Sequence, residues 1–169
     1  MIMTVTELRK HINTDKTDEV LTDMLAGIEQ SIRAYTNNHF HTDLRIYADI
    51  KDNKIIADSI PFLEGDTIEV IGTPASDGLY TVALDDVINE PVRDCENAVL
   101  RLVLYPVDVK HGAVSLIAYS LENEGKAGIS SETISRHSVT YKALDGNNSV
   151  MGYPLELVAF LKPYRRARF

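Results

Sequence analysis

The hydrophobic period of the chain changes twice, and this change restricts the fold more than any other feature. Between residues 18 and 37 the apolar side chains recur every three to four positions, as on one face of a helix. Leu44 to Ile50 alternates instead, which is typical of a half-buried strand. After Pro106 the helical spacing returns. We therefore predict an α+β fold, in which a small α-helical core carries an inserted small antiparallel β-barrel-like module.

A polar residue or a proline marks the start of each of about four predicted helices. Thr4 and Glu7 have the spacing of a capping box, in which each side chain accepts from the other residue's backbone amide. The first helix is expected to reach Ile12. The other helices should start at Asp15 or Thr17, at Pro106 and at Pro154; Gly125 and Gly128 would end the third, and Pro163 would kink or end the last.

Five short segments between the second and third helices have the patterns of strands. They cover residues 44–50, 54–57, 67–71, 79–84 and 98–105, with turn residues between them. Such a series is typical of a small antiparallel barrel. The predicted organisation is a β module at 43–105 inserted into a helical core at 1–42 and 106–169. This core also contains a long polar loop at 125–153 and a basic C-terminal tail.

Charge is distributed unevenly along the chain. The last eight residues, Lys162–Phe169, carry four positive charges and no negative one, whereas the preceding 161 residues carry 13 Lys and Arg against 25 Asp and Glu. A net charge of −8 argues against a general DNA-binding protein, because phosphate neutralisation drives non-specific affinity. The tail, which also contains Tyr164, suits contact with an acidic protein or nucleic acid. A frayed, solvated terminus is the alternative interpretation.

No segment of the sequence has the properties of a membrane anchor or an export signal. No apolar run approaches the roughly 20 residues that cross a bilayer, and the N-terminus has no basic stretch followed by an apolar core. A single Cys95 cannot form an internal disulfide. We therefore expect a soluble protein of the cytoplasm.

His39, His41 and Asp43 place three potential metal ligands within five residues. In an extended chain all three would point the same way. A metal site also needs a defined ligand number and geometry, so we favour polar residues at a helix-to-strand junction, and we predict no metal and no cofactor. The other histidines, His11, His111 and His137, are isolated in the sequence.

No motif supports enzyme chemistry. The serines of the polar loop have no nucleophile elbow around them. Asp94 and Glu96 should raise the pKa of Cys95 and reduce its reactivity. We predict that the protein is not an enzyme.

A nucleic-acid-binding or protein-interaction module that uses the β module is an alternative. Stacking on bases would need exposed aromatic side chains, for which Tyr47, Tyr80 and Tyr105 are the candidates. The excess of acidic over basic residues in this module weighs against it.

The C-terminal part of the chain resembles a known family. The stretch Gly128-Ile129-Ser130-Ser131-Glu132-Thr133-Ile134-Ser135-Arg136-His137-Ser138-Val139-Thr140-Tyr141 is similar to the segment G-I-x-S-E-x-I-x-x-x-S-V-x-Y of the head–tail connector (adaptor, or head-completion) proteins of long-tailed bacteriophages. The residues 148–154 followed by 161–169 look like the closing pattern of that family. The resemblance covers about residues 1–40 and 107–169 and is most specific in the final forty residues. The β module is a departure from it, since many relatives are helical with a short connection there.

The resemblance implies a structural virion protein. Copies of the chain would form a ring, expected to be a dodecamer, that docks under the portal, extends the DNA channel, and helps complete the head for tail attachment. Its partners would be itself, the portal protein, the next head-completion or tail protein, and double-stranded DNA that passes without sequence-specific binding. It would be made in the host bacterial cytoplasm, end at the head–tail interface of the virion, and contact no membrane.

Two sets of residues are predicted to make these contacts. Portal or neighbour docking is assigned to the basic tail, namely Lys162, Tyr164, Arg165, Arg166, Arg168 and Phe169. Contact with the lumen or with an adjacent subunit is assigned to the polar loop, namely Ser138, Val139, Thr140, Tyr141, Asn147 and Asn148.

Overall fold

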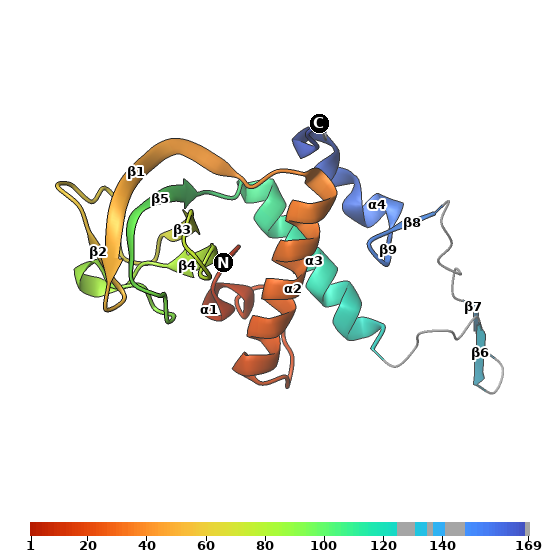
Figure 1. Ribbon diagram of the computed structural model, residues 1–169. Coiled ribbons are helices and arrows are strands. Elements are labelled where there is room, and N and C mark those ends of the chain that lie inside the picture. The colour runs from red at the N-terminus through yellow and green to blue at the C-terminus, as the bar shows by residue number, and fades with distance from the viewer. Residues whose placement is uncertain (125–130, 135–136, 141–147, 168–169) are drawn as a thin grey trace. The chain divides into compact units, whose positions relative to one another are not determined.

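The computed structural model describes residues 1–124, 131–134, 137–140 and 148–167, with the side chains of 131–134 and 137–140 left out (Figure 1). It divides into two compact units. A β unit contains Met1–Ile2 and Asn38–Tyr105, and a helical unit contains Met3–Asn37 and Pro106–Phe169. Helices together with an antiparallel sheet confirm the predicted α+β class.

The β unit is one curled sheet of five antiparallel strands (Figure 1). The strands are β1 (His41–Lys51), β2 (Lys54–Ile56), β3 (Thr67–Ile71), β4 (Gly78–Thr81) and β5 (Cys95–Val103), in the order β2-β1-β5-β3-β4. Asp52 and Asn53 connect β1 to β2 with positive φ of 51° and 61°, a conformation that Asp and Asn tolerate in tight hairpins. The predicted strands were all found, although β1 and β5 each begin three residues earlier than expected.

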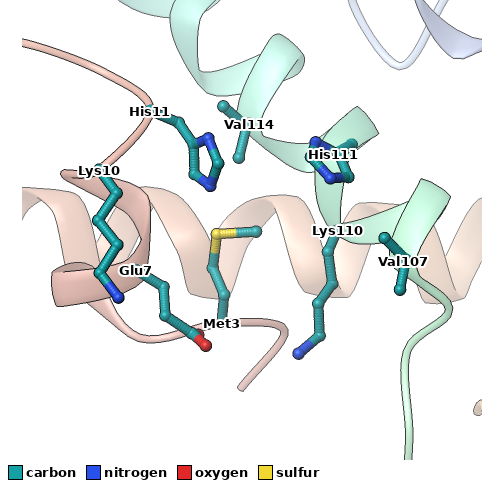
Figure 2. Close-up of a pocket in the computed structure, with 8 residues that line it drawn as sticks. All are labelled: Met3, Glu7, Lys10, His11, Val107, Lys110, His111 and Val114. Atoms are coloured by element: carbon teal, nitrogen blue, oxygen red, sulfur yellow. The ribbon is translucent and has the colours of Figure 1, made fainter.

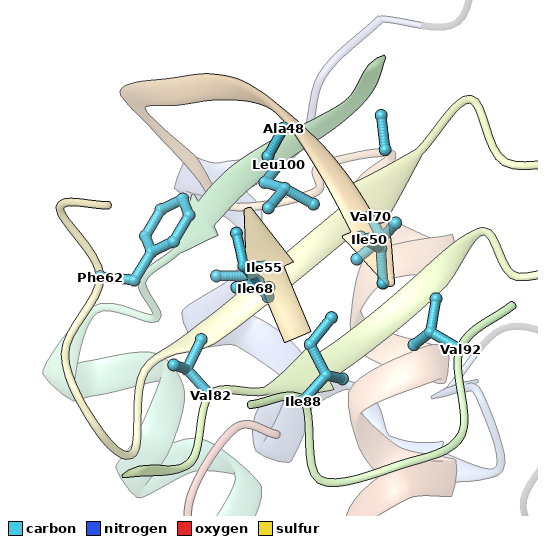
Figure 3. Close-up of a cluster of buried hydrophobic side chains, with 11 residues drawn as sticks. Ala48, Ile50, Ile55, Phe62, Ile68, Val70, Val82, Ile88, Val92 and Leu100 are labelled. Atoms are coloured by element: carbon cyan, nitrogen blue, oxygen red, sulfur yellow. The ribbon is translucent and has the colours of Figure 1, made fainter. Parts of the chain in front are cut away.

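Side chains from both the sheet and its loops form the core of this unit (Figure 3). The core consists of Ala48, Ile50, Ile55, Phe62, Ile68, Val70, Val82, Ile88, Val92, Ala98 and Leu100. Along β1 the alternation holds as predicted, since Ala48 and Ile50 are buried while Tyr47 and Asp49 are exposed. The concave face of the curled sheet therefore encloses its own hydrophobic cluster.

The helical unit is built from α1 (Val5–Leu8), α2 (Asp18–Thr36), α3 (Val107–Glu122), α4 (Leu155–Val158) and a 3₁₀ helix, η2 (Ala159–Tyr164). Both halves of the predicted capping box are present at Thr4 and Glu7, and Thr17 caps α2. α3 contacts α2 and also η2. The core of the helical unit includes Leu8, Leu21, Leu25, Ile28, Ile32, Val109, Ala113, Leu116, Ile117, Val158 and Leu161.

Three predicted helix ends differ from the structure. α1 is a single turn and does not reach Ile12. α3 ends at Glu122 with Asn123 as its cap, ahead of the glycines expected to stop it, which lie outside the described residues. The last helix tightens to 3₁₀ geometry after Val158 and continues past Pro163. A 3₁₀ turn of this kind accommodates the proline, which has no amide hydrogen to donate.

The segment predicted as a polar loop contains two hairpins where the structure describes it. β6 (Ser131–Ile134) pairs with β7 (His137–Thr140), and β8 (Ser149–Val150) pairs with β9 (Tyr153–Pro154). β-branched residues are frequent in these strands and favour extended backbone. No helix within the described ranges has the length and apolar character that a membrane crossing requires.

Candidate functional site

The basic C-terminal segment is held against the helical unit by its backbone. The Arg166 amide donates to the carbonyl of Thr36 (2.7 Å), and the Asn37 side-chain amide donates to the carbonyl of Ala167 (2.9 Å). Both anchors lie at the C-terminal end of α2, where the helix macrodipole favours positive charge. As far as Ala167, this segment is therefore fixed and not a frayed terminus.

Two side chains of this segment also have partners in the helical unit. The Tyr164 hydroxyl donates to both carboxylate oxygens of Asp108 (2.7 and 2.8 Å), and this hydrogen bond raises the pKa of Tyr164. The Arg165 guanidinium lies 5.1 Å from the centre of the Tyr35 ring, within the range of a cation–π contact. Lys162, Arg165 and Arg166 stay exposed, so the segment presents a basic surface in a defined conformation.

The other predicted contact residues are only partly described. Arg168, Phe169, Tyr141 and Asn147 lie outside the described residues. Ser138, Val139 and Thr140 belong to β7. The carbonyl of Asn148 accepts from the Leu155 amide at 3.0 Å.

A groove of about 220 Å³ opens between the α1 segment and one face of α3 (Figure 2). Its lining consists of Met3, Glu7, Lys10, His11, Val107, Lys110, His111 and Val114. The rings of His11 and His111, which are far apart in the sequence, meet edge to face with centroids 5.7 Å apart. The groove combines histidine and lysine side chains from both elements with the Glu7 carboxylate and with the apolar side chains of Met3, Val107 and Val114.

Glu7 at the rim of the groove gives a pH-dependent prediction. The backbone amide of Thr4 lowers the pKa of Glu7 below 4.5, with help from Lys110 and Lys10 and against the effect of burial. A lowered pKa contributes stability that is complete above 4.5 and is lost as the pH falls through the folded-state value. In thermal denaturation, Glu7→Gln should lower the free energy of unfolding by less than about 1 kcal/mol at pH 7, and this difference should be smaller at pH 3. An equal difference at both pH values would contradict this assignment.

A cluster of polar side chains lies where β1 begins in the β unit. His39 Nδ1 lies 3.1 and 3.2 Å from the two carboxylate oxygens of Glu69, and His41 Nε2 contacts the same carboxylate. Arg101 Nη1 lies 3.2 Å from His41 Nδ1. Burial lowers the pKa of His41, and Arg101 and His39 act in the same direction, while Glu69 opposes them. Asp43, the third potential ligand in the sequence, is not part of the cluster, and Glu69 from β3 lies beside the histidines instead.

Cys95 is half-buried at the start of β5. Burial is the main cause that raises its pKa, and the carboxylates of Asp49, Asp94 and Asp77 add to it. The predicted rise is confirmed, although Glu96 does not contribute. A thiol with a raised pKa is a poor nucleophile.

Of the three tyrosines considered for base stacking, two are engaged within the β unit. Tyr105 is 4 % exposed and packs on the Phe40 ring, and the Tyr80 hydroxyl donates to the Ser76 carbonyl at 2.8 Å. Tyr47 alone among them is exposed, at 58 %. One aromatic ring is a weak platform for single-stranded nucleic acid.

These features define an α+β protein with a curled antiparallel sheet, a small helical unit and a basic surface at its C-terminal end. No protein-family model matches the chain, and no curated protein sequence matches it.

Proposed function

We propose that this chain is a structural head–tail connector, or adaptor, of a long-tailed bacteriophage. It would oligomerise into a ring under the portal, extend the DNA channel and help complete the head for tail attachment. The observation that carries the proposal is the basic C-terminal segment, fixed on the end of α2 with Lys162, Arg165 and Arg166 exposed. This segment lies in the part of the sequence that resembles the connector family.

A fixed basic segment on an acidic chain is suited to oriented docking. Its conformation is set before binding, so less conformational entropy is lost when a partner binds. Opposite charge on the portal would steer the encounter and suppress wrong orientations. The first 161 residues, in which 25 Asp and Glu outnumber 13 Lys and Arg, would repel DNA and let it pass through the ring.

The polar segment with β6 to β9 is the proposed contact with the lumen or with a neighbouring copy. A ring of identical subunits buries two different patches on every copy and closes when the rotation between copies allows it. A polar segment of this kind suits such a contact, because a neighbouring copy can supply surface for it to pack on.

The docking step can be tested with the double variant Lys162→Glu/Arg166→Glu and the portal protein of the same phage. These side chains are exposed, and the hydrogen bond of Arg166 to α2 uses its backbone amide, so the fold is expected to persist. Charge reversal should weaken portal binding by roughly tenfold or more in sedimentation or pull-down experiments at moderate salt.

The matched control is Lys51→Glu/Lys54→Glu, which makes the same change of net charge at exposed positions of the β unit. It should leave portal binding unchanged. Portal binding that is equally strong in the wild type and in Lys162→Glu/Arg166→Glu, with unaltered circular dichroism, would remove the docking role of the tail.

A further inference from the structure

We propose that His39, His41 and Glu69 bind one divalent transition cation of the zinc type. Each residue offers one ligand atom, and these atoms all lie within 4.8 Å of one another. Two imidazole nitrogens and one carboxylate oxygen are ligands that Zn²⁺ accepts readily. The site belongs to the β unit and is independent of the basic C-terminal segment.

Phe40 lies between the two histidines, and its backbone is held in an uncommon conformation. Phe40 has a positive φ of 55°, which is uncommon for a bulky residue and costs free energy. Two contacts hold it there: its amide donates to Asn38 Oδ1 at 2.9 Å, and its ring packs on Tyr105 with centroids 4.8 Å apart. A strained residue that is anchored on both sides is often found where side chains must converge.

Glu69 supplies the third ligand from a different strand. The Glu69 side chain is 12 % exposed and the His41 side chain is 16 % exposed, so both are largely packed against the β unit. The nitrogen-to-oxygen distances between His39 and Glu69, 3.1 and 3.2 Å, are near the ligand spacing of a tetrahedral zinc site, and the ligand atoms of the cluster, which all lie within 4.8 Å of one another, would draw together on an ion. Ligands with bonds of about 2.0–2.1 Å at tetrahedral angles lie roughly 3.3 Å apart.

The site has an entrance. The His39 side chain is 59 % exposed, so a hydrated ion can reach the cluster from solvent. Three protein ligands leave the fourth position of a tetrahedral ion to water.

Arg101 competes with the ion and sets the affinity. Its guanidinium can only donate, so His41 Nδ1 accepts from it and His41 Nε2 carries the proton that faces Glu69. When an ion binds His41 Nε2, the imidazole carries its proton on Nδ1 instead. Two N–H donors, His41 Nδ1–H and an N–H group of Arg101, then face each other. Arg101 must then turn away, and its positive charge opposes the cation as well.

Because Arg101 competes with the ion, variants of the full chain should differ in Zn²⁺ affinity in a defined order, which isothermal titration calorimetry can measure. His41→Ala and Glu69→Gln should bind Zn²⁺ at least roughly tenfold more weakly than the wild type, since the loss of a residue that only hydrogen-bonds to a ligand already costs that much. His39→Ala should also bind more weakly, and its exposed position makes it the variant that best preserves the fold. Arg101→Met should bind more tightly than the wild type.

The control is His11→Ala/His111→Ala, which removes the histidine pair of the helical unit and should leave Zn²⁺ affinity unchanged. Co²⁺ should give the intense visible absorption of a four-coordinate ion in the wild type and lose it in His39→Ala. If Zn²⁺ affinity is the same in the wild type, His39→Ala and His41→Ala, or if Arg101→Met does not bind more tightly, the cluster is a hydrogen-bond network alone and the proposal fails.

Discussion

Leu100→Ala is expected to lower the free energy of unfolding by about 2–5 kcal/mol. Leu100 is fully buried in the core of the β unit. It lies on β5, the strand between β1 and β3, where its register partners are Ile46 and Val70. A cavity at this position removes contacts to two strands at once, and the pleated sheet cannot collapse to fill it without moving its hydrogen bonds. Urea unfolding followed by circular dichroism measures the loss.

Leu104→Ala makes the same chemical change four residues further along the chain. The Leu104 side chain is 61 % exposed, so its truncation should change stability by no more than about 0.5 kcal/mol. Domains have a total stability of roughly 5–15 kcal/mol, so Leu100→Ala can leave the β unit largely unfolded while Leu104→Ala does not. Equal losses in the two variants would show that the core does not depend on β5.

Features that depend on local sequence could be predicted. α2 follows from the spacing of its apolar residues, and its ends follow from Thr17 and from Asn37, which adopts the left-handed conformation. The hairpin of β1 and β2 follows from Asp52-Asn53. Each signal lies within a few residues of the structure it specifies, so no knowledge of distant contacts is needed.

The histidine cluster could be predicted only in part. The sequence places His39 and His41 close together, and it suggests Asp43 as a third ligand because that residue is near. The carboxylate that meets the histidines belongs to Glu69, about thirty residues later. Glu69 is placed by the pairing of β3 with β5, where it lies opposite Arg101. Strand register of this kind depends on the whole sheet, and no short motif encodes it.

The C-terminal segment shows the same limit. Its charge is evident from the sequence. The contacts that fix it join distant residues, since Arg166 bonds to Thr36 through its backbone and Tyr164 bonds to Asp108, 56 residues away. Composition predicts a basic segment, but only the tertiary contacts hold that segment in one conformation. A solvated terminus and a preorganised docking surface have the same charge, so the sequence alone could not distinguish them.

Two glycines inside the long helices should respond in opposite directions to substitution by alanine. Gly112→Ala in α3 should lower the free energy of unfolding by about 1–3 kcal/mol, because a Cβ there would lie 2.1–2.4 Å from ring carbons of Phe160. Gly27→Ala in α2 should raise it by up to about 1 kcal/mol, since nothing lies within 4 Å of that Cβ. Thermal and urea denaturation of both variants measure these changes in the free energy of unfolding.

The gain in helix propensity is the same at both positions, so the difference between the two variants isolates the contact with Phe160. Close approach of η2 to α3 at this point therefore requires a residue without a side chain. Phe160→Leu in the Gly112→Ala background should recover at least half of the lost stability, because the smaller side chain can move aside. Stabilisation by Gly112→Ala would mean that the ring swings away at little cost, and that α3 and η2 are not packed through this glycine.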